Sequence, residues 1–234
     1  MRTIHLSARL AAIAAFVGKA RVFADVGSDH AYLPLWMLIN SKTERVIAID
    51  AKKGPLENGR ANAVYFGLED KCDFRFGCGL GPLSEGEADC VCIAGLGGAA
   101  IIRILEEAGD KAKSFPSLVL GPQSLGDEVR LFLAEKGYGV AQSDYVQDGH
   151  IFYPILRIES ASPAQNLTEE EAVFPIRPAL EGSERYRSYL LHRKRELEKA
   201  LGSLRHAKSP DKVAIASKQA KLMAVDERLA LYNR

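Results

Sequence analysis

The fold of this chain is decided by the stretch RVFADVGSDH, residues 21–30. Its first half is almost continuously apolar and rich in β-forming residues, and it then breaks into Gly27 and polar side chains. Runs of this kind are typical of parallel strands, which are covered by helices on both faces of a sheet. The stretch therefore predicts a buried parallel strand that ends in a polar, glycine-containing loop.

Similar short apolar runs recur along the chain and are separated by segments with helical periodicity. We predict further strands at 45–50, 72–76, 89–94, 117–120, 138–146 and 150–158. Helices are predicted at 6–17, 33–40, 54–66, 98–108 and 125–136. Gln147-Asp148-Gly149 is a hairpin turn signal, so the last two strands are expected to be antiparallel. The predicted fold class is α/β, a doubly wound, mostly parallel, seven-stranded Rossmann-like sheet.

The C-terminal part of the chain has a different pattern. Two segments, from Gly182 to about Lys208 and from Asp211 to Arg234, are separated by Ser209-Pro210. Mostly apolar residues recur in them with steps of three and four: Tyr186, Leu190, Arg193, Leu197, Ala200 and Leu204 in the first, and Ile215, Lys218, Leu222, Val225, Leu229 and Tyr232 in the second. Such a spacing is typical of helices that pack along a seam. We expect a sheet domain over residues 1–160 and an antiparallel helical hairpin, similar to a coiled coil, over residues 165–234.

Charge is distributed unevenly along the 234 residues, although the net charge of the whole chain is only +1. Residues 182–221 contain 11 basic and 4 acidic side chains, a net charge of +7. Lysine and arginine in such a segment can bind nucleic-acid phosphates. They can equally form the solvated face of a coiled coil or the arm of a dimer, so both interpretations stay open. The sequence is compatible with a monomer or a homodimer.

The loop after the first predicted strand indicates the class of ligand. A dinucleotide-binding loop would have the pattern G-x-G-x-x-G, which brings a pyrophosphate against the backbone. Here Asp25 replaces the first glycine, and Asp29 lies where a phosphate would be expected. Two carboxylates would repel pyrophosphate, but they suit a ligand with an ammonium and a sulfonium group, such as S-adenosylmethionine. Asp50, at the end of the second strand, could accept both ribose hydroxyls or simply cap the following helix.

Glycine-rich loops follow the third and fourth predicted strands. Gly77-Cys78-Gly79 leaves room for an adenine ring, and Ala94-Gly95-Leu96-Gly97-Gly98 follows the fourth strand. Methyltransferases that act on exocyclic amines often have Asn-Pro-Pro-aromatic at the latter place, so that chemistry is disfavoured here. Each loop alone could be a tight turn, but polar or glycine loops after four consecutive strands favour a ligand site.

Several runs of the sequence resemble the bacterial tRNA (adenine-22-N1)-methyltransferase family. They are LSARL (6–10), DVGSDHAYLP (25–34), IAGLGG (93–98) and DGHIFY (148–153). The resemblance covers roughly residues 4–160 and extends to the helical tail. It implies a class I methyltransferase domain over residues 1–160, S-adenosylmethionine as cofactor, tRNA as partner and methyl transfer to N1 of adenine 22.

Fourteen residues are expected to form the cofactor site, most of them by position in this resemblance. They are Arg9, Asp25, Gly27, Ser28, Asp29, His30, Asp50, Ala51, Gly77, Cys78, Ala94, Gly95, Gly97 and Gly98. Asp29, His30 and Tyr32 are the candidate catalytic residues: Asp29 as a base or charge stabiliser, and the other two to orient or stack the target base. The chain departs from the family at Cys78, where asparagine is expected, and in Gly121-Pro122-Gln123-Ser124, where Gln-Pro-Asn is expected.

Other functions and sites are less well supported by the sequence. An NAD-dependent oxidoreductase would share Asp50 but lacks its glycine fingerprint, and a non-catalytic RNA-binding scaffold would not explain the four loops. A methyltransferase acting on another RNA or a small molecule stays open. The four cysteines form no C-x-x-C pair, so no metal is expected. We expect no membrane span and a cytoplasmic location.

Overall fold

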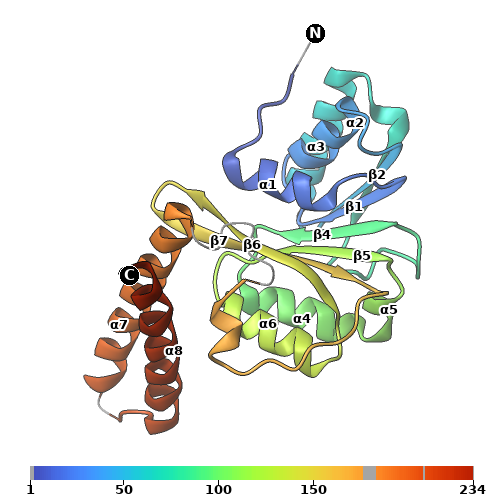
Figure 1. Cartoon of the computed structure of the whole chain (residues 1–234). Helices are drawn as coiled ribbons and strands as arrows, with labels where there is room; N and C mark the ends of the chain where they lie inside the picture. Colours follow the sequence, from blue (N-terminus) through green and yellow to red (C-terminus); the bar gives the residue numbers. More distant parts are fainter. Residues whose placement is uncertain (1–2, 176–182, 208, 234) are drawn as a thin grey trace.

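The computed structural model describes residues 3–175, 183–207 and 209–233 of the chain (Figure 1). Its strands are, in chain order, β1 (Val22–Val26), β2 (Arg45–Asp50), β3 (Cys72–Phe76), β4 (Cys90–Ala94), β5 (Ser117–Gly121), β6 (Val140–Asp148) and β7 (Ile151–Glu159). They form one sheet in the order β3-β2-β1-β4-β5-β7-β6. All neighbours are parallel except β5–β7 and β6–β7, which are antiparallel. The predicted α/β sheet is confirmed, including its antiparallel end.

Helices cover both faces of the sheet. They are α1 (Ala8–Val17), α2 (Tyr32–Ile39), α3 (Lys53–Phe66), α4 (Gly98–Ala108), α5 (Asp110–Lys113) and α6 (Gly126–Glu135). Figure 1 shows α1, α2 and α3 on one face and α4, α5 and α6 on the other. The single turn α5 was not predicted, because four residues are too few to establish a helical period. The order of the strands places the loops after β1, β2 and β4 side by side at one edge of the sheet.

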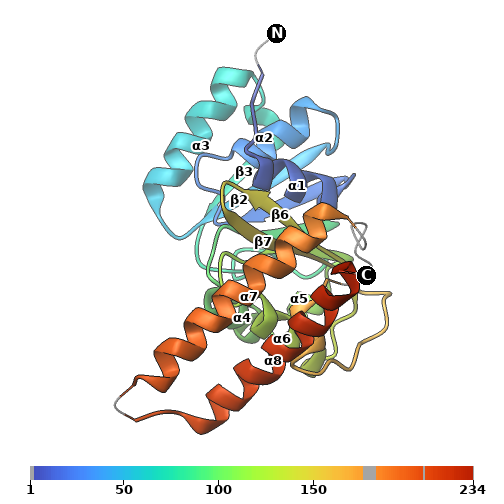
Figure 2. The same cartoon turned by 60° about the vertical axis from the view of Figure 1, so that its left-hand side comes forward.

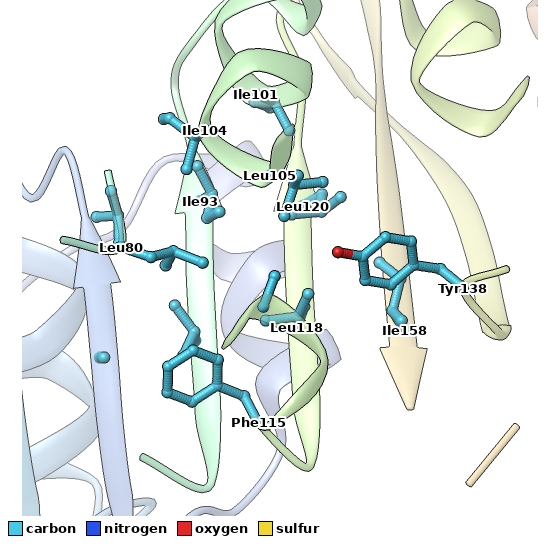
Figure 3. Close-up of a cluster of buried hydrophobic side chains, with 14 of the residues drawn as sticks. Leu80, Ile93, Ile101, Ile104, Leu105, Phe115, Leu118, Leu120, Tyr138 and Ile158 are labelled. Atoms are coloured by element: carbon cyan, nitrogen blue, oxygen red, sulfur yellow. The ribbon is translucent and has the colours of Figure 1, made fainter. Parts of the chain in front are cut away.

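Two apolar clusters, one for each face of the sheet, form most of the core. The cluster under α4 joins Ile93 of β4, Leu118 and Leu120 of β5 and Ile158 of β7 to Ile101 of α4 (Figure 3). The cluster under α1 and α2 contains both Cys90 and Cys92, which point to the same face as their alternation along the strand predicts. These thiols are buried as small apolar groups.

The β6–β7 hairpin extends past the neighbouring strand β5. Pairing between β5 and β7 ends at Leu120 and Leu156, whereas β6 and β7 stay paired as far as Asp148 and Ile151. The extension therefore rises beyond the edge at which the parallel strands end. One of its faces packs against the helix α1, and the other face packs against the C-terminal helices.

The C-terminal helices are α7 (Glu184–Arg205) and α8 (Lys212–Ala230), which lie side by side and antiparallel (Figure 2). The predicted hairpin is thereby confirmed, while its predicted termini Gly182, Lys208 and Arg234 lie outside the described residues. Ser183 is the N-cap of α7, and its hydroxyl accepts a hydrogen bond from the Tyr186 backbone N–H. Side-chain capping of this kind satisfies a free N–H at a helix start.

The residues buried by this hairpin differ in part from the predicted seams. Tyr189 is buried but was not predicted, because α7 packs against the β6–β7 hairpin as well as against α8. Leu201 is also buried and was not predicted. Arg193 and Lys218 occupy predicted seam positions, yet their side chains form ion pairs with carboxylates of α6. A heptad pattern cannot reveal a third element that competes for the same face.

An ion cluster fixes the hairpin to the sheet domain. The Asp127 carboxylate of α6 lies 2.6 Å from the Arg193 guanidinium and 3.7 Å from the Lys221 ammonium, and Asp127 and Lys221 are almost fully buried. Burial lowers the pKa of Arg193, but Asp127, Tyr189, Tyr145 and Glu196 together outweigh burial and leave that pKa above its ordinary value. Next to this cluster, the buried Arg130 guanidinium donates to the backbone carbonyls of Glu171 and Ala172.

Candidate functional site

Two hollows meet where the loops after β1, β2 and β4 lie side by side. The first has a volume of about 270 Å³ and is lined by Arg9, Leu10, Asp25, Gly27, Ser28, Asp29, His30, Tyr32, Leu33, Ala94, Gly95 and Gln123. The second, of about 480 Å³, is lined by residues 26, 27 and 29 of the first loop, by Asp50, Ala51, Lys52, Pro55, Gly77, Cys78 and Gly79, and by residues 96, 100, 103, 104 and 107. Gly27 and Asp29 line both hollows, so the two hollows meet at the loop after β1.

The backbone of this loop is held in an uncommon conformation. Gly27, Asp29 and Ala31 all have positive φ angles, of 78°, 29° and 58°. The backbone N–H groups of Gly27 and Ser28 both donate to the Ile49 carbonyl of β2, at 2.8 and 3.1 Å. Left-handed backbone at two non-glycine residues costs about 1–3 kcal/mol each and is found mainly at functional sites. The conformation of this loop lowers the stability of the protein and is the kind found where side chains must be held in place for function.

Asp25 is a buried carboxyl group at the bottom of the first hollow, with only 7% of its surface exposed. Burial raises its pKa to about 6; the neighbouring Ser28 hydroxyl and Cys92 thiol oppose the shift, and the negative charge of Asp50 adds to it. Burial deprives the Asp25 carboxylate of the hydration that stabilises its negative charge in water. A positively charged ligand group beside it would stabilise that charge instead.

Asp50 lies at the end of β2 and lines the second hollow. One of its carboxylate oxygens accepts a hydrogen bond from the Lys52 backbone N–H at 2.8 Å. Asp50 does not cap the following helix, since the N-cap of α3 is Lys52 and no side chain caps it. The other carboxylate oxygen of Asp50 has no hydrogen-bond partner among the described residues. Beside it, a Cβ on Gly77 would lie 2.5 Å from Pro82, so only glycine fits the wall of this hollow.

Arg9 reaches the first hollow from α1. Its guanidinium lies over the Tyr153 ring of β7, 5.1 Å from the ring centre. The Nε atom of Arg9 is buried and has no hydrogen-bond partner among the described residues. Arg9 and the buried Asp25 give the inner part of the hollow a cationic and an anionic group, which match the carboxylate and ammonium of a free amino acid moiety.

Three exposed side chains form the mouth of the first hollow. His30 Nε2 lies 3.6 Å from Asp29 Oδ1, and the His30 ring stacks on the Tyr32 ring with 5.6 Å between the ring centres. Tyr32 is 47% exposed. The backbone carbonyl of His30 accepts a hydrogen bond from the Asn62 side chain at 2.9 Å, which ties this segment to α3. The structure therefore brings the three predicted catalytic residues together beside the acidic loop.

Two predicted residues lie outside the hollows. Gly97 and Gly98 begin α4 and pack against the loop after β5, where a Cβ on Gly98 would lie 2.5 Å from the Ser124 carbonyl oxygen. This close approach of two loops requires glycine at position 98. The other twelve residues of the predicted cofactor site line one or both hollows.

Gln123 was not among the predicted site residues, although its loop was noted as a departure from the family pattern. Its side chain lines the first hollow. The sequence signal for it was the position of the loop directly after the fifth strand, because that strand also ends at the ligand edge of the sheet.

Other features of the described residues concern membranes and metals. No helix within residues 3–175, 183–207 and 209–233 is long and apolar enough to cross a membrane. In the same part of the chain, histidine, cysteine and acidic side chains form no group of three or more that could hold a metal ion.

Comparison with known proteins defines the class of this fold and site. A family model for methyltransferase domains matches residues 6–156. The tRNA (adenine(22)-N(1))-methyltransferase of Bacillus subtilis is 34% identical over 160 residues, which cover 68% of this chain and 67% of the relative. The chain is thus a methyltransferase-domain protein. Within that class, it belongs to the tRNA (adenine-22-N1)-methyltransferase family.

Solved structures agree with this assignment over the whole length of the chain. A Streptococcus pneumoniae protein provisionally assigned as a tRNA (m1A22) methyltransferase, solved with S-adenosyl-L-methionine, is 28% identical with a TM-score of 0.80 and covers 96% of this chain and 100% of its own. The m1A22 tRNA methyltransferase of B. subtilis is 26% identical with a TM-score of 0.74, and 98% of each chain is covered. These matches leave the oxidoreductase and the non-catalytic scaffold without support.

Proposed function

We propose that this protein transfers a methyl group from S-adenosylmethionine to N1 of an adenine in tRNA, at position 22 as in its B. subtilis relative. The observation that carries the proposal is the junction of the two hollows at Asp29. One hollow has the charges for an amino acid moiety, and the other has a carboxylate oxygen and small-residue walls suited to a nucleoside. A target base entering by His30 and Tyr32 would meet the junction between them.

The residues of both hollows fit S-adenosylmethionine. The buried Nε of Arg9 offers a donor for the carboxylate, and Asp25 offers a negative charge for the ammonium group. The unused oxygen of Asp50 is available for ribose hydroxyls, and Gly77-Cys78-Gly79 leaves space for the adenine ring. When bound, S-adenosylmethionine supplies a methyl group on a positively charged sulfur.

The residues at the mouth of the first hollow would act on the target base. Adenine N1 lies on the pairing edge, so the base must leave its helix before it can react. The stacked His30 and Tyr32 rings provide an exposed aromatic surface for such a base. Methylation of N1 places a positive charge on the base, and the exposed Asp29 carboxylate at the junction would stabilise that charge or accept a proton from N6.

The helical hairpin is proposed to contribute to tRNA binding. Many of its cations are occupied internally: Arg193, Lys194, Lys218 and Lys221 all form ion pairs with carboxylates. The exposed basic residues without a partner among the described residues include Arg195, Lys199, Arg205 and Lys212. Cations that are not paired with carboxylates of the protein are free to neutralise phosphates and release their counterions. The four free cysteines and a tRNA substrate support a cytoplasmic location.

Nucleoside mass spectrometry tests the proposed function directly. Unmodified tRNA with adenine at position 22 is incubated with the protein and S-adenosylmethionine carrying a labelled methyl group, and the product is digested to nucleosides. We expect labelled 1-methyladenosine, and its absence from tRNA in which guanine replaces adenine 22. A labelled product other than 1-methyladenosine would contradict the assignment to N1, and equal labelling of the guanine-22 tRNA would contradict the position.

A further inference from the structure

Gln123 lies at a fixed place on the wall of the first hollow. Its backbone N–H donates to the Leu96 carbonyl at 2.8 Å, and the flanking residues Gly121 and Ser124 accept from Gly95 and Gly98 at 3.2 and 3.1 Å. These three backbone hydrogen bonds join the loop after β5 to the loop after β4. The position from which the Gln123 side chain projects is therefore set by the sheet and not by a free loop.

The Gln123 carboxamide has unused hydrogen-bonding capacity. It has no hydrogen-bond partner among the described residues, and the residue is exposed. Its Nε2 lies close above Gly95, at 4.0 Å from where a Cβ on that glycine would be. The other polar groups that line this hollow are charged groups, hydroxyls and an imidazole, so Gln123 supplies its one carboxamide, with an acceptor and a donor side by side.

Adenine offers a matching pair of groups next to the reacting atom. A glutamine carboxamide recognises adenine through N6 and N7, accepting from the amino group and donating to the ring nitrogen. This mode of binding leaves N1 and its lone pair free, as methyl transfer to N1 requires. A guanine in the same place would present a carbonyl oxygen instead of the amino group and leave the amide oxygen opposed to it.

We infer that Gln123 recognises the target base by hydrogen bonds to adenine N6 and N7, and thereby selects adenine for N1 methylation. The inference rests on the proposed function and adds to it the residue that reads the base. It assigns base selection to the loop after β5, whereas Asp29 acts on the charge that develops at N1. Because its carboxamide is neutral, Gln123 is not one of the charged groups proposed to bind the cofactor.

The test uses the full-length protein and tRNA assembled from synthetic fragments with either adenosine or 7-deazaadenosine at position 22. Methyl transfer is measured under single turnover at saturating S-adenosylmethionine. We expect the wild type to lose about 10- to 100-fold in rate at subsaturating tRNA when N7 is replaced by carbon, because one bidentate partner is lost. Gln123→Ala should methylate both tRNAs equally, near the wild-type rate on the 7-deazaadenosine tRNA.

A second variant separates the two hydrogen bonds. Gln123→Glu keeps an acceptor for N6 but opposes a carboxylate to the N7 lone pair, so we expect it to methylate 7-deazaadenosine tRNA at least as fast as adenosine tRNA. S-adenosylhomocysteine affinity, measured by calorimetry, should be unchanged in both variants, which shows that the cofactor side of the site is intact. Since Gln123 is exposed, neither variant is expected to disturb folding.

Two results would overturn the inference while leaving the proposed function in place. One is a wild-type enzyme that methylates both tRNAs equally. The other is a Gln123→Ala variant that keeps the full wild-type preference for adenosine over 7-deazaadenosine. A wild type that binds S-adenosylhomocysteine but methylates neither tRNA would remove the proposed function, and the inference with it.

Discussion

Asp25 links the stability of the ligand-free protein to pH. Its pKa rises from 3.8 to about 6 on folding, so between these pH values the native state holds a proton that the unfolded state has released. Stability contributed by this group therefore falls as pH rises from about 4 to 6 and is constant above that. Two pKa units correspond to ~3 kcal/mol. This is the expense of keeping a carboxylate ready for a cationic ligand.

Replacement of Asp25 by asparagine should remove that expense. We expect Asp25→Asn to raise the free energy of unfolding of the ligand-free protein by ~2–3 kcal/mol at pH 8 and by much less at pH 4.5. Urea unfolding of both proteins at the two pH values measures the difference. An identical pH dependence in the wild type and the variant would show that Asp25 does not titrate in this range.

Asp50 provides the sharpest test of where the nucleoside binds. Asp50→Ala removes the charged acceptor proposed for the ribose hydroxyls, which costs ~1.5–3 kcal/mol, or roughly ten- to hundredfold in S-adenosylmethionine affinity. Calorimetry checks this, with Asp70→Ala as the control, because Asp70 is exposed and lines neither hollow. Unchanged affinity in Asp50→Ala would count against this placement of the cofactor.

Asp29 is expected to act on the reaction and less on cofactor binding. Asparagine tolerates the positive φ of this residue, so Asp29→Asn keeps the loop and removes only the charge. If Asp29 takes a proton from the base, single-turnover methylation at saturating S-adenosylmethionine should fall by ~10²-fold. A near-normal rate, with weaker cofactor binding, would assign Asp29 to the cofactor amino group instead.

At the level of residues, the sequence predicts the site residues that directly follow strands, but not those whose position depends on contacts between loops. Asp25, Asp50 and Gly77 could be placed because parallel strands end at one edge of a sheet. Backbone hydrogen bonds between the loops after β4 and β5 place Gln123 at the first hollow. The same contact between the loops leaves Gly97 outside both hollows. Such pairings join segments about 25 residues apart, and no local pattern records them.

At the level of elements, the ion cluster between α6 and α7 determines how the hairpin is held. Asp127→Asn would leave Arg193 and the buried Lys221 without their carboxylate, and we expect a loss of 3–5 kcal/mol of stability, as for other broken buried pairs. Urea unfolding measures the loss, and faster hydrogen exchange in α7 locates it.

The exposed pair between α7 and α8 is the matched control for that variant. Asp226 lies 2.7 Å from the Lys194 ammonium, and both side chains are partly exposed. Asp226→Asn should cost no more than about 1 kcal/mol, because exposed ion pairs contribute little. Equal losses in the two variants would mean that Asp127 has no special part in docking the hairpin.

The helices themselves were predictable from the sequence, but the surfaces they use were not. Steps of three and four located α7 and α8 and their antiparallel order, since a short turn joins two amphipathic segments. The β6–β7 hairpin extends past β5 and supplies Tyr145 and Phe152, which pack against Tyr189 of α7. The sequence predicted the turn of that hairpin but not its length beyond the sheet.

At the level of the whole molecule, basic side chains are available on two sides. Arg195, Lys199 and Arg205 are exposed on α7, which packs against the hairpin at the ligand edge of the sheet. Lys19, Arg21 and Lys71 are exposed around a surface hollow where β1 and β2 begin, at the opposite edge. Net charge is the same for both groups, so only their position relative to the site distinguishes them.

This arrangement predicts which group binds tRNA. Glutamine at all three α7 positions should lower tRNA affinity and reduce the slope of log affinity against log salt concentration by ~2–3, because about three fewer counterions are released. Glutamine at Lys19, Arg21 and Lys71 should leave the slope within about one unit of the wild type. Both triple variants should bind S-adenosylhomocysteine with unchanged affinity, since none of the six residues lines a cofactor hollow. Filter binding of tRNA over a range of salt concentrations measures the slopes. If the α7 variant keeps the wild-type slope, the charge of the hairpin serves its own packing or an oligomer, and the tRNA contacts lie elsewhere on the molecule.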